Sequence, residues 1–162
     1  MTHSTRLRIV GCPAMAAMLI VAIFMVSHSA RAAGGDDDAS SPEYSLARNA
    51  LDDEDYEVAI NKLRTLHEKE PKNADVLNLL GYGYRKTGDF DQARDYYLQA
   101  LAIEPEHRGA NEYIGELYLE TGQLDKAEER LAVLDKACWL GCEEYTELKE
   151  SIEKYKTAKG IQ

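Results

Sequence analysis

The stretch LNLLGYGYRKTGDFDQARDYYLQALAIEP, Leu77 to Pro105, decides the fold. Its apolar residues recur at helical spacing on both sides of a short polar break, KTGD, at residues 86–89. Gly88 can take the positive φ that ends a helix, and Asp89 can cap the next one. Pro105 ends the second helix because its ring and its missing N–H forbid continuation. The stretch therefore predicts two antiparallel helices joined by a tight turn.

The same pattern returns with a period of thirty-four residues on both sides of this stretch. Large apolar, small and aromatic positions each match their counterparts one period away. The matched sets are Leu46, Leu80 and Ile114; Ala47, Gly81 and Gly115; Ala50, Tyr84 and Tyr118; Tyr56, Phe90 and Leu124; Ala59, Ala93 and Ala127; Leu63, Tyr97 and Leu131; and Leu66, Ala100 and Leu134. Three helix–turn–helix units are therefore expected, at about residues 40–73, 74–107 and 108–141.

This thirty-four-residue unit resembles the tetratricopeptide repeat family. The middle unit carries the paired leucines, the glycine, the tyrosine, the turn glycine, both alanines and the final proline of the family's motif. In the first unit Glu54 replaces the turn glycine, and we expect its first helix, around residues 43–51, to be irregular. The third unit lacks the final proline and has Trp139 there. The resemblance covers residues 40–141 and implies an all-α fold, an α–α superhelix of three repeats.

A further helix is predicted after the third unit, over residues 143–159, EEYTELKESIEKYKTAK. Glutamates gather at its start and lysines near its end, in the order that the helix dipole favours, and Gly160 stops it. The apolar residues that recur on one side are Tyr145, Leu148, Ile152 and Tyr155. Because a solenoid needs a terminal element to cover its last apolar face, we expect a capping helix here and a repeat domain over residues 42–159.

The N-terminus predicts export. Two arginines precede the apolar run AMAAMLIVAIFMV, and the small-residue pattern that ends at Ala32 is typical of a signal peptidase site. We therefore expect a signal peptide at residues 1–32, a flexible acidic leader at residues 33–41 and a periplasmic or secreted mature protein. The alternative is an uncleaved anchor, since the apolar segment is just long enough for a membrane span, although Pro13 interrupts it.

The charge of the chain limits its partners. It has 19 basic and 29 acidic residues, which give a net charge of −10 at neutral pH. General nucleic-acid binding needs basic surface to neutralise phosphates, and adhesion to anionic lipid needs the same. We therefore expect no nucleic-acid partner and no electrostatic attachment to a membrane surface.

The stretch CWLGC, Cys138 to Cys142, follows the third unit. Haem attachment requires a C-x-x-C-H spacing, which Gly141 breaks, and zinc requires two more soft ligands. In an exported protein, two cysteines that flank a glycine-containing turn favour a structural disulfide. Free buried thiols, and redox or metal chemistry, remain as alternatives. We expect Trp139 to pack over the last helix pair.

The sequence carries no motif of catalysis. It has no phosphate-binding glycine loop, no nucleophile elbow and no paired-histidine metal motif. The glycines of GYGYRKTG are explained by helix packing and by the turn. His67 and His107 are single residues far along the chain, and we expect both to be exposed. We therefore predict that the protein is not an enzyme and has no catalytic residue, metal site or cofactor.

The resemblance implies a concave groove, lined by the first helix of each repeat, that grips an extended peptide or a helix of a partner protein. Candidates are the side chains of those helices that are not committed to packing. They would make a groove that is basic toward the N-terminus and acidic toward the C-terminus, with tyrosines between; the alternative is that they are ordinary solvated helix faces. These candidates are Tyr44, Arg48, Leu51, Asn78, Tyr82, Arg85, Glu112, Tyr113, Glu116 and Leu119. Tyrosine and arginine are well represented at binding hot spots.

The family's carboxylate clamp, which holds the C-terminal tails of heat-shock chaperones, is not predicted. It requires lysines and asparagines at particular groove sites, and here those sites hold Tyr44, Arg48, Leu79, Gly109 and Tyr113. The resemblance thus predicts a non-catalytic protein-interaction scaffold in the periplasm, with a protein or peptide ligand. The alternative is a membrane-tethered assembly factor that uses an uncleaved N-terminal anchor.

Overall fold

The computed structural model describes residues 41–161, which form seven α-helices and no β-strand. For this part of the chain the predicted all-α fold is confirmed. The expected signal peptide at residues 1–32, and all but the last residue of the expected leader at residues 33–41, lie outside the described residues. Within residues 41–161, no helix is long and apolar enough to cross a bilayer.

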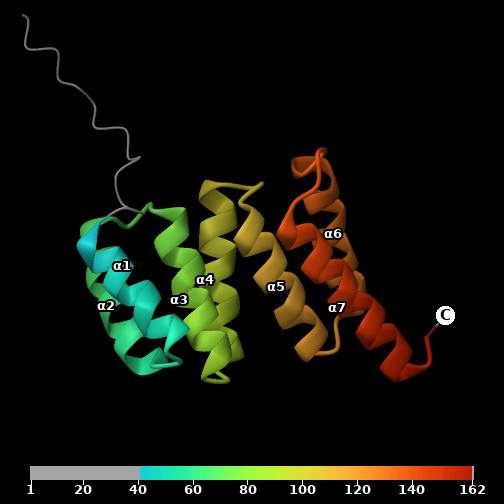
Figure 1. The fold of residues 1–162 in the computed structure, drawn as a ribbon, viewed down its shortest axis with the longest axis horizontal. Helices are drawn as coiled ribbons and strands as arrows, with labels where there is room; N and C mark the ends of the chain where they lie inside the picture. The colour runs from blue at the N-terminus through green and yellow to red at the C-terminus, as the bar shows by residue number, and fades with distance from the viewer. Residues whose placement is uncertain (1–40, 162) are drawn as a thin grey trace, which may run out of the picture. The chain divides into compact units, whose positions relative to one another are not determined.

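The helices form three antiparallel pairs followed by a single helix (Figure 1). They are α1 (Pro42–Asp52), α2 (Tyr56–Lys69), α3 (Ala74–Lys86), α4 (Phe90–Ile103), α5 (Arg108–Glu120), α6 (Leu124–Ala137) and α7 (Glu143–Lys159). Each predicted thirty-four-residue unit contains one pair. Helix α7 packs on both members of the last pair, α5 and α6.

The turn inside each of the three helix pairs contains one residue with a left-handed backbone conformation. Gly88 ends the α3 segment with φ of +82°, and Gly122 ends the α5 segment with φ of +76°. Glycine adopts this conformation without steric cost because it has no Cβ. At the matching place in the first pair stands Glu54 with φ of +61°, a conformation that costs an L residue about 1–2 kcal/mol.

Helix α1 is continuous over its eleven residues, so the expectation of an irregular first helix is wrong. The physical reason lies at its start. The Ser41 hydroxyl accepts a hydrogen bond from the Tyr44 N–H at 3.1 Å, which satisfies one of the free donors of the first turn. Pro42 then fits the first helical position, where no N–H partner is needed.

Two glycines let helices approach closely. A Cβ on Gly81 would lie 2.5 Å from the ring of Tyr97, so the backbone of α3 at Gly81 packs directly against the Tyr97 ring of α4. A Cβ on Gly115 would lie 2.6 Å from Leu148, so α5 meets α7 in the same way. Both partner side chains are fully buried. These contacts explain why the period keeps a small residue at this position.

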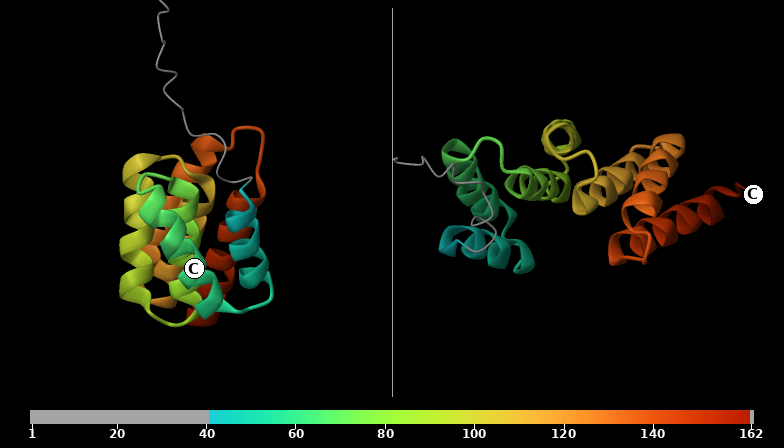
Figure 2. Two further views of the ribbon diagram at one scale, coloured as in Figure 1. Left: turned by 90° about the vertical axis from the view of Figure 1, so that its left-hand side faces the viewer. Right: turned by 90° about the horizontal axis from the view of Figure 1, so that it is seen from above.

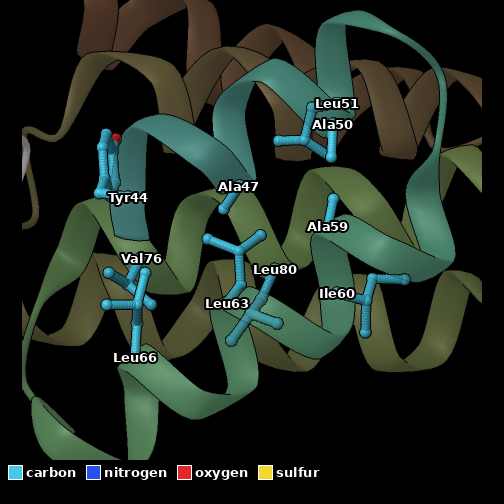
Figure 3. Packing of buried hydrophobic residues seen from close by; sticks show 10 residues of the cluster. All are labelled: Tyr44, Ala47, Ala50, Leu51, Ala59, Ile60, Leu63, Leu66, Val76 and Leu80. Carbon is cyan, nitrogen blue, oxygen red and sulfur yellow. The ribbon is translucent and has the colours of Figure 1, made fainter. Parts of the chain in front are cut away.

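The core runs along the stack as linked clusters. The first cluster joins α1, α2 and α3 (Figure 3) and consists of Tyr44, Ala47, Ala50, Leu51, Ala59, Ile60, Leu63, Leu66, Val76 and Leu80. A second joins α5, α6 and α7 with Ala93 and Tyr97 of α4. Each pair therefore buries its apolar face against its neighbour, as in a repeat stack.

The stack bends because its two layers pack differently. Within the described residues, α1, α3, α5 and α7 each contact the next in the series. The backbones of α2, α4 and α6 lie farther apart, although the rings of His67 on α2 and Tyr96 on α4 meet edge to face at 6.1 Å. Figure 2 shows the helices following one another along the stack. The layer of α1, α3, α5 and α7 therefore lies on the inner side of the bend, and we call its outward surface the concave face.

Candidate partner-binding face

The period of thirty-four places equivalent side chains in rows across the concave face. Because α1, α3 and α5 end at matching places in their units, a residue and its counterpart one period later lie at the same height on adjacent helices. The three rows of candidates are Tyr44, Asn78 and Glu112; Arg48, Tyr82 and Glu116; and Leu51, Arg85 and Leu119. Tyr113 lies beside Glu112 on α5. The structure therefore brings all ten predicted residues onto one layer of helices.

Burial divides the candidates into two groups. Six are buried, namely Tyr44, Leu51, Asn78, Arg85, Glu112 and Leu119. For these six, the expectation that they are not committed to packing is wrong, because adjacent first helices lie in contact and cover each other's flanks. Solvent reaches the other four, which are Arg48, Tyr82, Tyr113 and Glu116.

Arg85 is buried in a cage of opposite charge. Its Nη2 lies 2.6 Å from Glu116 Oε2, and its Nη1 donates to Glu120 Oε1 at 2.7 Å. Burial on its own lowers the pKa of Arg85, but Tyr97 and the two carboxylates outweigh it and hold that pKa above its usual range. A buried charge is tolerated when it is paired and hydrogen-bonded in this way. The guanidinium therefore joins α3 to α5 and is not available to a partner.

Two tyrosines complete this cage. The guanidinium carbon of Arg85 lies 5.6 Å from the ring centroid of Tyr82 and 5.7 Å from that of Tyr113. The two ring centroids are 5.0 Å apart. Both distances to the cation are within the range of cation–π attraction. The partly exposed rings are thereby held in fixed positions on the concave face.

The sequence did not identify Glu120 as a site residue, although it supplies half of the Arg85 ion pair. Glu120 lies one helical turn after Glu116, so both carboxylates project from the same side of α5. The available signal was the pair of glutamates four residues apart on α5, because the matching stretch of α3, about one period earlier, carries Arg85. It was masked by the abundance of exposed glutamates in the chain.

Within residues 41–161, no cation pairs with the buried carboxyl group of Glu112. It is 4% exposed, and its burial, its hydrogen bond with Glu147 of α7 and the negative charges of Glu147, Glu116 and Glu144 together raise its pKa to about 9. At neutral pH the Glu112 carboxyl is therefore protonated and donates to Glu147. This hydrogen bond joins α5 to α7.

The concave face is hollowed toward its C-terminal end. The cavity there has a volume of about 430 Å³ and opens between α3, α5 and α7. Its lining residues are Arg85, Lys86, Glu116, Leu119, Glu120, Ser151 and Tyr155. Of the predicted candidates, Arg85, Glu116 and Leu119 line it. The capping helix thus also forms a wall of the groove, a role that its position in the sequence did not suggest.

His107 and Asp75 form a pair that resembles part of a catalytic arrangement, but both ring nitrogens are in use. His107 Nε2 lies 3.1 Å from Asp75 Oδ1, and His107 Nδ1 accepts from the Ala110 N–H at 3.1 Å. The hydrogen bond with His107 lowers the pKa of Asp75. The imidazole is the N-cap of α5, which leaves no free nitrogen to take a proton from a substrate.

The histidines are less accessible than predicted. His67 and His107 are both partly buried, and the His107 side chain is only 9% exposed. The expectation that they are exposed is therefore wrong. The His107 ring is held between Asp75 of α3 and the Ala110 N–H in the first turn of α5, which limits its exposure.

Cys138 and Cys142 form a disulfide in the structure, with their Cα atoms 5.5 Å apart. Within residues 41–161, the one group of potential metal-ligand atoms consists of these two sulfurs and a Glu144 carboxylate oxygen, which lie within 4.8 Å of one another. Sulfurs joined to each other do not act as thiolate ligands. Trp139 is 82% exposed, so the expectation that it packs over the last helix pair is wrong.

Comparison with known proteins gives a family match over most of the helices. A family model described as "Tetratricopeptide repeat" matches residues 50–97 and again residues 84–137, which together exceed half of the chain. A curated relative, tetratricopeptide repeat protein 30 homolog of Caenorhabditis briggsae, is 44% identical over 52 residues. That match covers 32% of this chain and only 8% of the relative.

Solved structures with a similar fold include a chaperone of Yersinia enterocolitica, the protein PcrH and a human domain. The type III secretion translocator chaperone SycD of Yersinia enterocolitica has a TM-score of 0.65 at 22% identity, over 74% of this chain and 84% of its own. PcrH, in complex with the chaperone-binding region of PopD, has a TM-score of 0.65 at 18% identity, over 78% of this chain and 97% of PcrH. The second tetratricopeptide repeat domain of human RPAP3, in complex with an HSP70 peptide, has a TM-score of 0.61 at 18% identity, over 70% of this chain and 92% of that domain. At these identities the likeness is one of fold.

Proposed function

Because the chain belongs to the tetratricopeptide repeat family, we propose that it is a non-catalytic scaffold, exported to the periplasm, that binds a segment of a partner protein along its concave face. One observation carries this proposal. Arg48, Tyr82 and Glu116 stand at the same place on three successive first helices, and solvent reaches all three. A segment that crosses these helices meets one of them in each repeat.

The chemistry of the row suits a protein segment. Arg48 is an exposed cation that can pair with an acidic side chain, and Tyr82 and Tyr113 offer ring surface for an apolar one. The Arg85 cage fixes both rings before a ligand arrives, which reduces the ordering cost of binding. In this proposal, the buried candidates hold the face in shape while the exposed ones contact the partner.

The kind of ligand is supported by structures of similar fold. PcrH was solved with a region of PopD bound, and the RPAP3 domain with an HSP70 peptide. In both cases the bound molecule is a segment of another protein. For the present chain we infer only that its ligand, too, is a segment of another protein.

The absence of catalysis is part of the proposal. Within residues 41–161 both nitrogens of His107 are occupied, and the carboxyl groups of the concave face are paired with Arg85 or with each other. We expect the purified protein to show no turnover.

Partner capture tests the binding face directly. We propose affinity capture from periplasmic extract with the wild-type protein, with the double variant Arg48→Glu, Tyr82→Ser, and with Arg64→Glu as a matched control on the exposed side of α2. The double variant should recover its partner at least about tenfold less well, since hot-spot contacts contribute more than about 1 kcal/mol each. Equal recovery by the double variant would place the binding surface elsewhere.

Export and the disulfide form a second part of the proposal. A periplasmic location is supported by the pattern of residues 1–32 and by the paired cysteines, which persist as a disulfide in oxidising compartments. Mass spectrometry of the protein from the periplasmic fraction should find an N-terminus at residue 33 and no free thiol at Cys138 or Cys142. An intact N-terminus in the membrane fraction would instead support the alternative, a scaffold tethered by an uncleaved anchor.

A further inference from the structure

The most unusual surface feature of the described residues is the loop between α6 and α7. Trp139 is 82% exposed and Leu140 is 80% exposed, side by side in the chain. An exposed pair of large apolar side chains is costly in water and marks an interaction site far more often than a scattered single residue does. Nothing in the proposed role of the concave face uses this pair.

The backbone holds the pair in place. The disulfide joins Cys138 to Cys142, and the Gly141 N–H donates to the Cys138 carbonyl at 2.6 Å inside the closed loop. Gly141 has φ of +87°, a conformation that favours glycine. The two apolar side chains are thus presented by a short, covalently closed turn. Such a turn loses little conformational entropy when it docks.

A matching cavity lies at the other end of the stack. It has a volume of about 210 Å³ and lies between α1 and α2, lined by Glu43, Leu46, Lys62, Thr65, Leu66 and Lys69. This is below the roughly 300–1,000 Å³ of pockets for small molecules, so it suits a single large side chain. Leu46 on its rim is 52% exposed, although it belongs to the apolar row of α1.

The repeat explains why this cavity is open. One period later, Leu46 corresponds to Leu80 and Leu66 to Ala100, and both counterparts are fully buried. Leu80 is buried against the pair that precedes it. Within residues 41–161 no helix pair precedes α1, so none of the described helices covers the same surface of the first repeat. The cavity therefore lies on the face where a further element of the stack would pack.

The charges around the two features are mostly complementary, because the cavity lining has two lysines against one glutamate, Glu43. Glu143 and Glu144 follow the loop at the start of α7, and Lys62 and Lys69 line the cavity. We propose that Trp139 of one copy of this protein docks into the α1–α2 cavity of a second copy, with Leu140 packing against the cavity rim, so that copies associate head to tail. Such a contact joins different surfaces of the two copies, and it adds further copies unless the chain closes into a ring.

Sedimentation velocity and fluorescence test this association. Trp139 is the only tryptophan of the chain, so its emission reports its own docking. With protein purified from cells that express the whole chain, the sedimentation coefficient should rise with concentration and the emission should shift to shorter wavelength. Trp139→Ala should weaken self-association by more than about tenfold, while Leu98→Ala, which removes another exposed leucine on α4, should not. A wild-type protein that stays monomeric over the whole range overturns the proposal.

A mixing experiment identifies the partner surface. Trp139→Ala retains the α1–α2 cavity but lacks the tryptophan that docks into it. Leu46→Asp retains Trp139 but places a charge at the cavity, so that Trp139 of another copy cannot dock there. Each variant alone should be monomeric, and their equimolar mixture should form a 1:1 dimer and nothing larger, because only one of the two interfaces can form. Circular dichroism melts confirm that both variants are folded. A mixture that stays monomeric, or a Leu46→Asp variant that associates like wild type, contradicts head-to-tail docking into this cavity.

Discussion

Two buried ionisable groups, Arg85 and Glu112, lie on adjacent first helices and are stabilised in opposite ways. Arg85 on α3 is 7% exposed and stays charged, since two carboxylates and two aromatic rings surround its guanidinium. Glu112 on α5 is 4% exposed and is neutral, since burial and then the neighbouring carboxylates raise its pKa. One site satisfies a buried charge by pairing it, and the other removes the charge by protonation.

The difference shows how the concave face is held together. Arg85 joins α3 to α5 by ion pairs, whereas Glu112 joins α5 to α7 by a hydrogen bond that exists only while a proton is bound. The two helix junctions should therefore respond differently to pH. The junction with the capping helix is the sensitive one.

The largest expected effect is the pH dependence of the Glu112 junction. The pKa of Glu112 rises from 4.5 to about 9 on folding, so its stabilising contribution is full below pH 4.5 and is lost as the pH rises toward 9. In that window the free energy of unfolding should fall by on the order of 1 kcal/mol per pH unit. Glu112→Gln should flatten this slope, since an amide donates the same hydrogen bond without a charge. Urea denaturation at several pH values measures both slopes.

A matched control keeps this comparison specific. Glu129→Gln changes an exposed glutamate on α6 and should leave the slope of the wild type unaltered. Parallel slopes for wild type and Glu112→Gln would show that Glu112 is ionised in the folded protein.

The next largest effect concerns the partners of Arg85. Glu116→Gln combined with Glu120→Gln leaves the buried guanidinium without a counter-charge. The free energy of unfolding should fall by about 2 kcal/mol, less than the 3–5 kcal/mol of a fully buried pair, because both glutamate side chains are partly exposed. Urea denaturation at pH 7 checks this value. A loss no larger than that of Glu129→Gln would mean that the ion pairs contribute nothing.

A smaller effect is expected from the rings around Arg85. Tyr113→Leu keeps an apolar side chain but removes the ring that faces the guanidinium at 5.7 Å, and should cost about 1 kcal/mol. Tyr145→Leu is the matched comparison, since its ring faces an exposed lysine, Lys149, at 5.9 Å. The thermal midpoint should drop more for Tyr113→Leu. Equal drops in the thermal midpoint would show that the cation–π contact between Tyr113 and Arg85 does not add to stability.

The smallest effect is a shift in one titration. Glu147→Gln removes a negative charge beside Glu112 and retains an oxygen that can accept its hydrogen bond. The pKa of Glu112 should move toward its ordinary value, although burial should keep it raised. Carbon-13 NMR of the side-chain carboxyl groups follows this titration. An unchanged pKa would show that burial alone accounts for it.

The fold was predictable because the signals for it are local and recur. The period of thirty-four, the turn glycines and Pro105 each act within one helix pair, so the sequence shows them directly. The first helix was predicted wrongly because Glu54 replaces a glycine there. Its left-handed backbone is nevertheless adopted, since the packing of α1 on α2 and α3 outweighs a local cost of about 1–2 kcal/mol.

The candidate face was predictable only in part, because burial depends on neighbouring helices. The sequence places Arg85 on the first helix of its repeat, but gives no sign that Glu120, thirty-five residues later, neutralises it. It likewise places Glu112 on α5 without showing that Glu147 of the capping helix lies opposite. Trp139 was expected to pack over the last helix pair, whereas it is 82% exposed in the disulfide-closed loop. Contacts between elements decided each case.

Site-specific photo-crosslinking in the periplasm tests the central claim, that the concave face binds a partner segment. A photoreactive phenylalanine would replace Arg48, which is exposed on α1, or Leu98, which is 47% exposed on α4 in the outer layer of helices. We expect a discrete crosslinked partner band from position 48 and none from position 98. A partner band from position 98 alone, or equal bands from both, would contradict that claim.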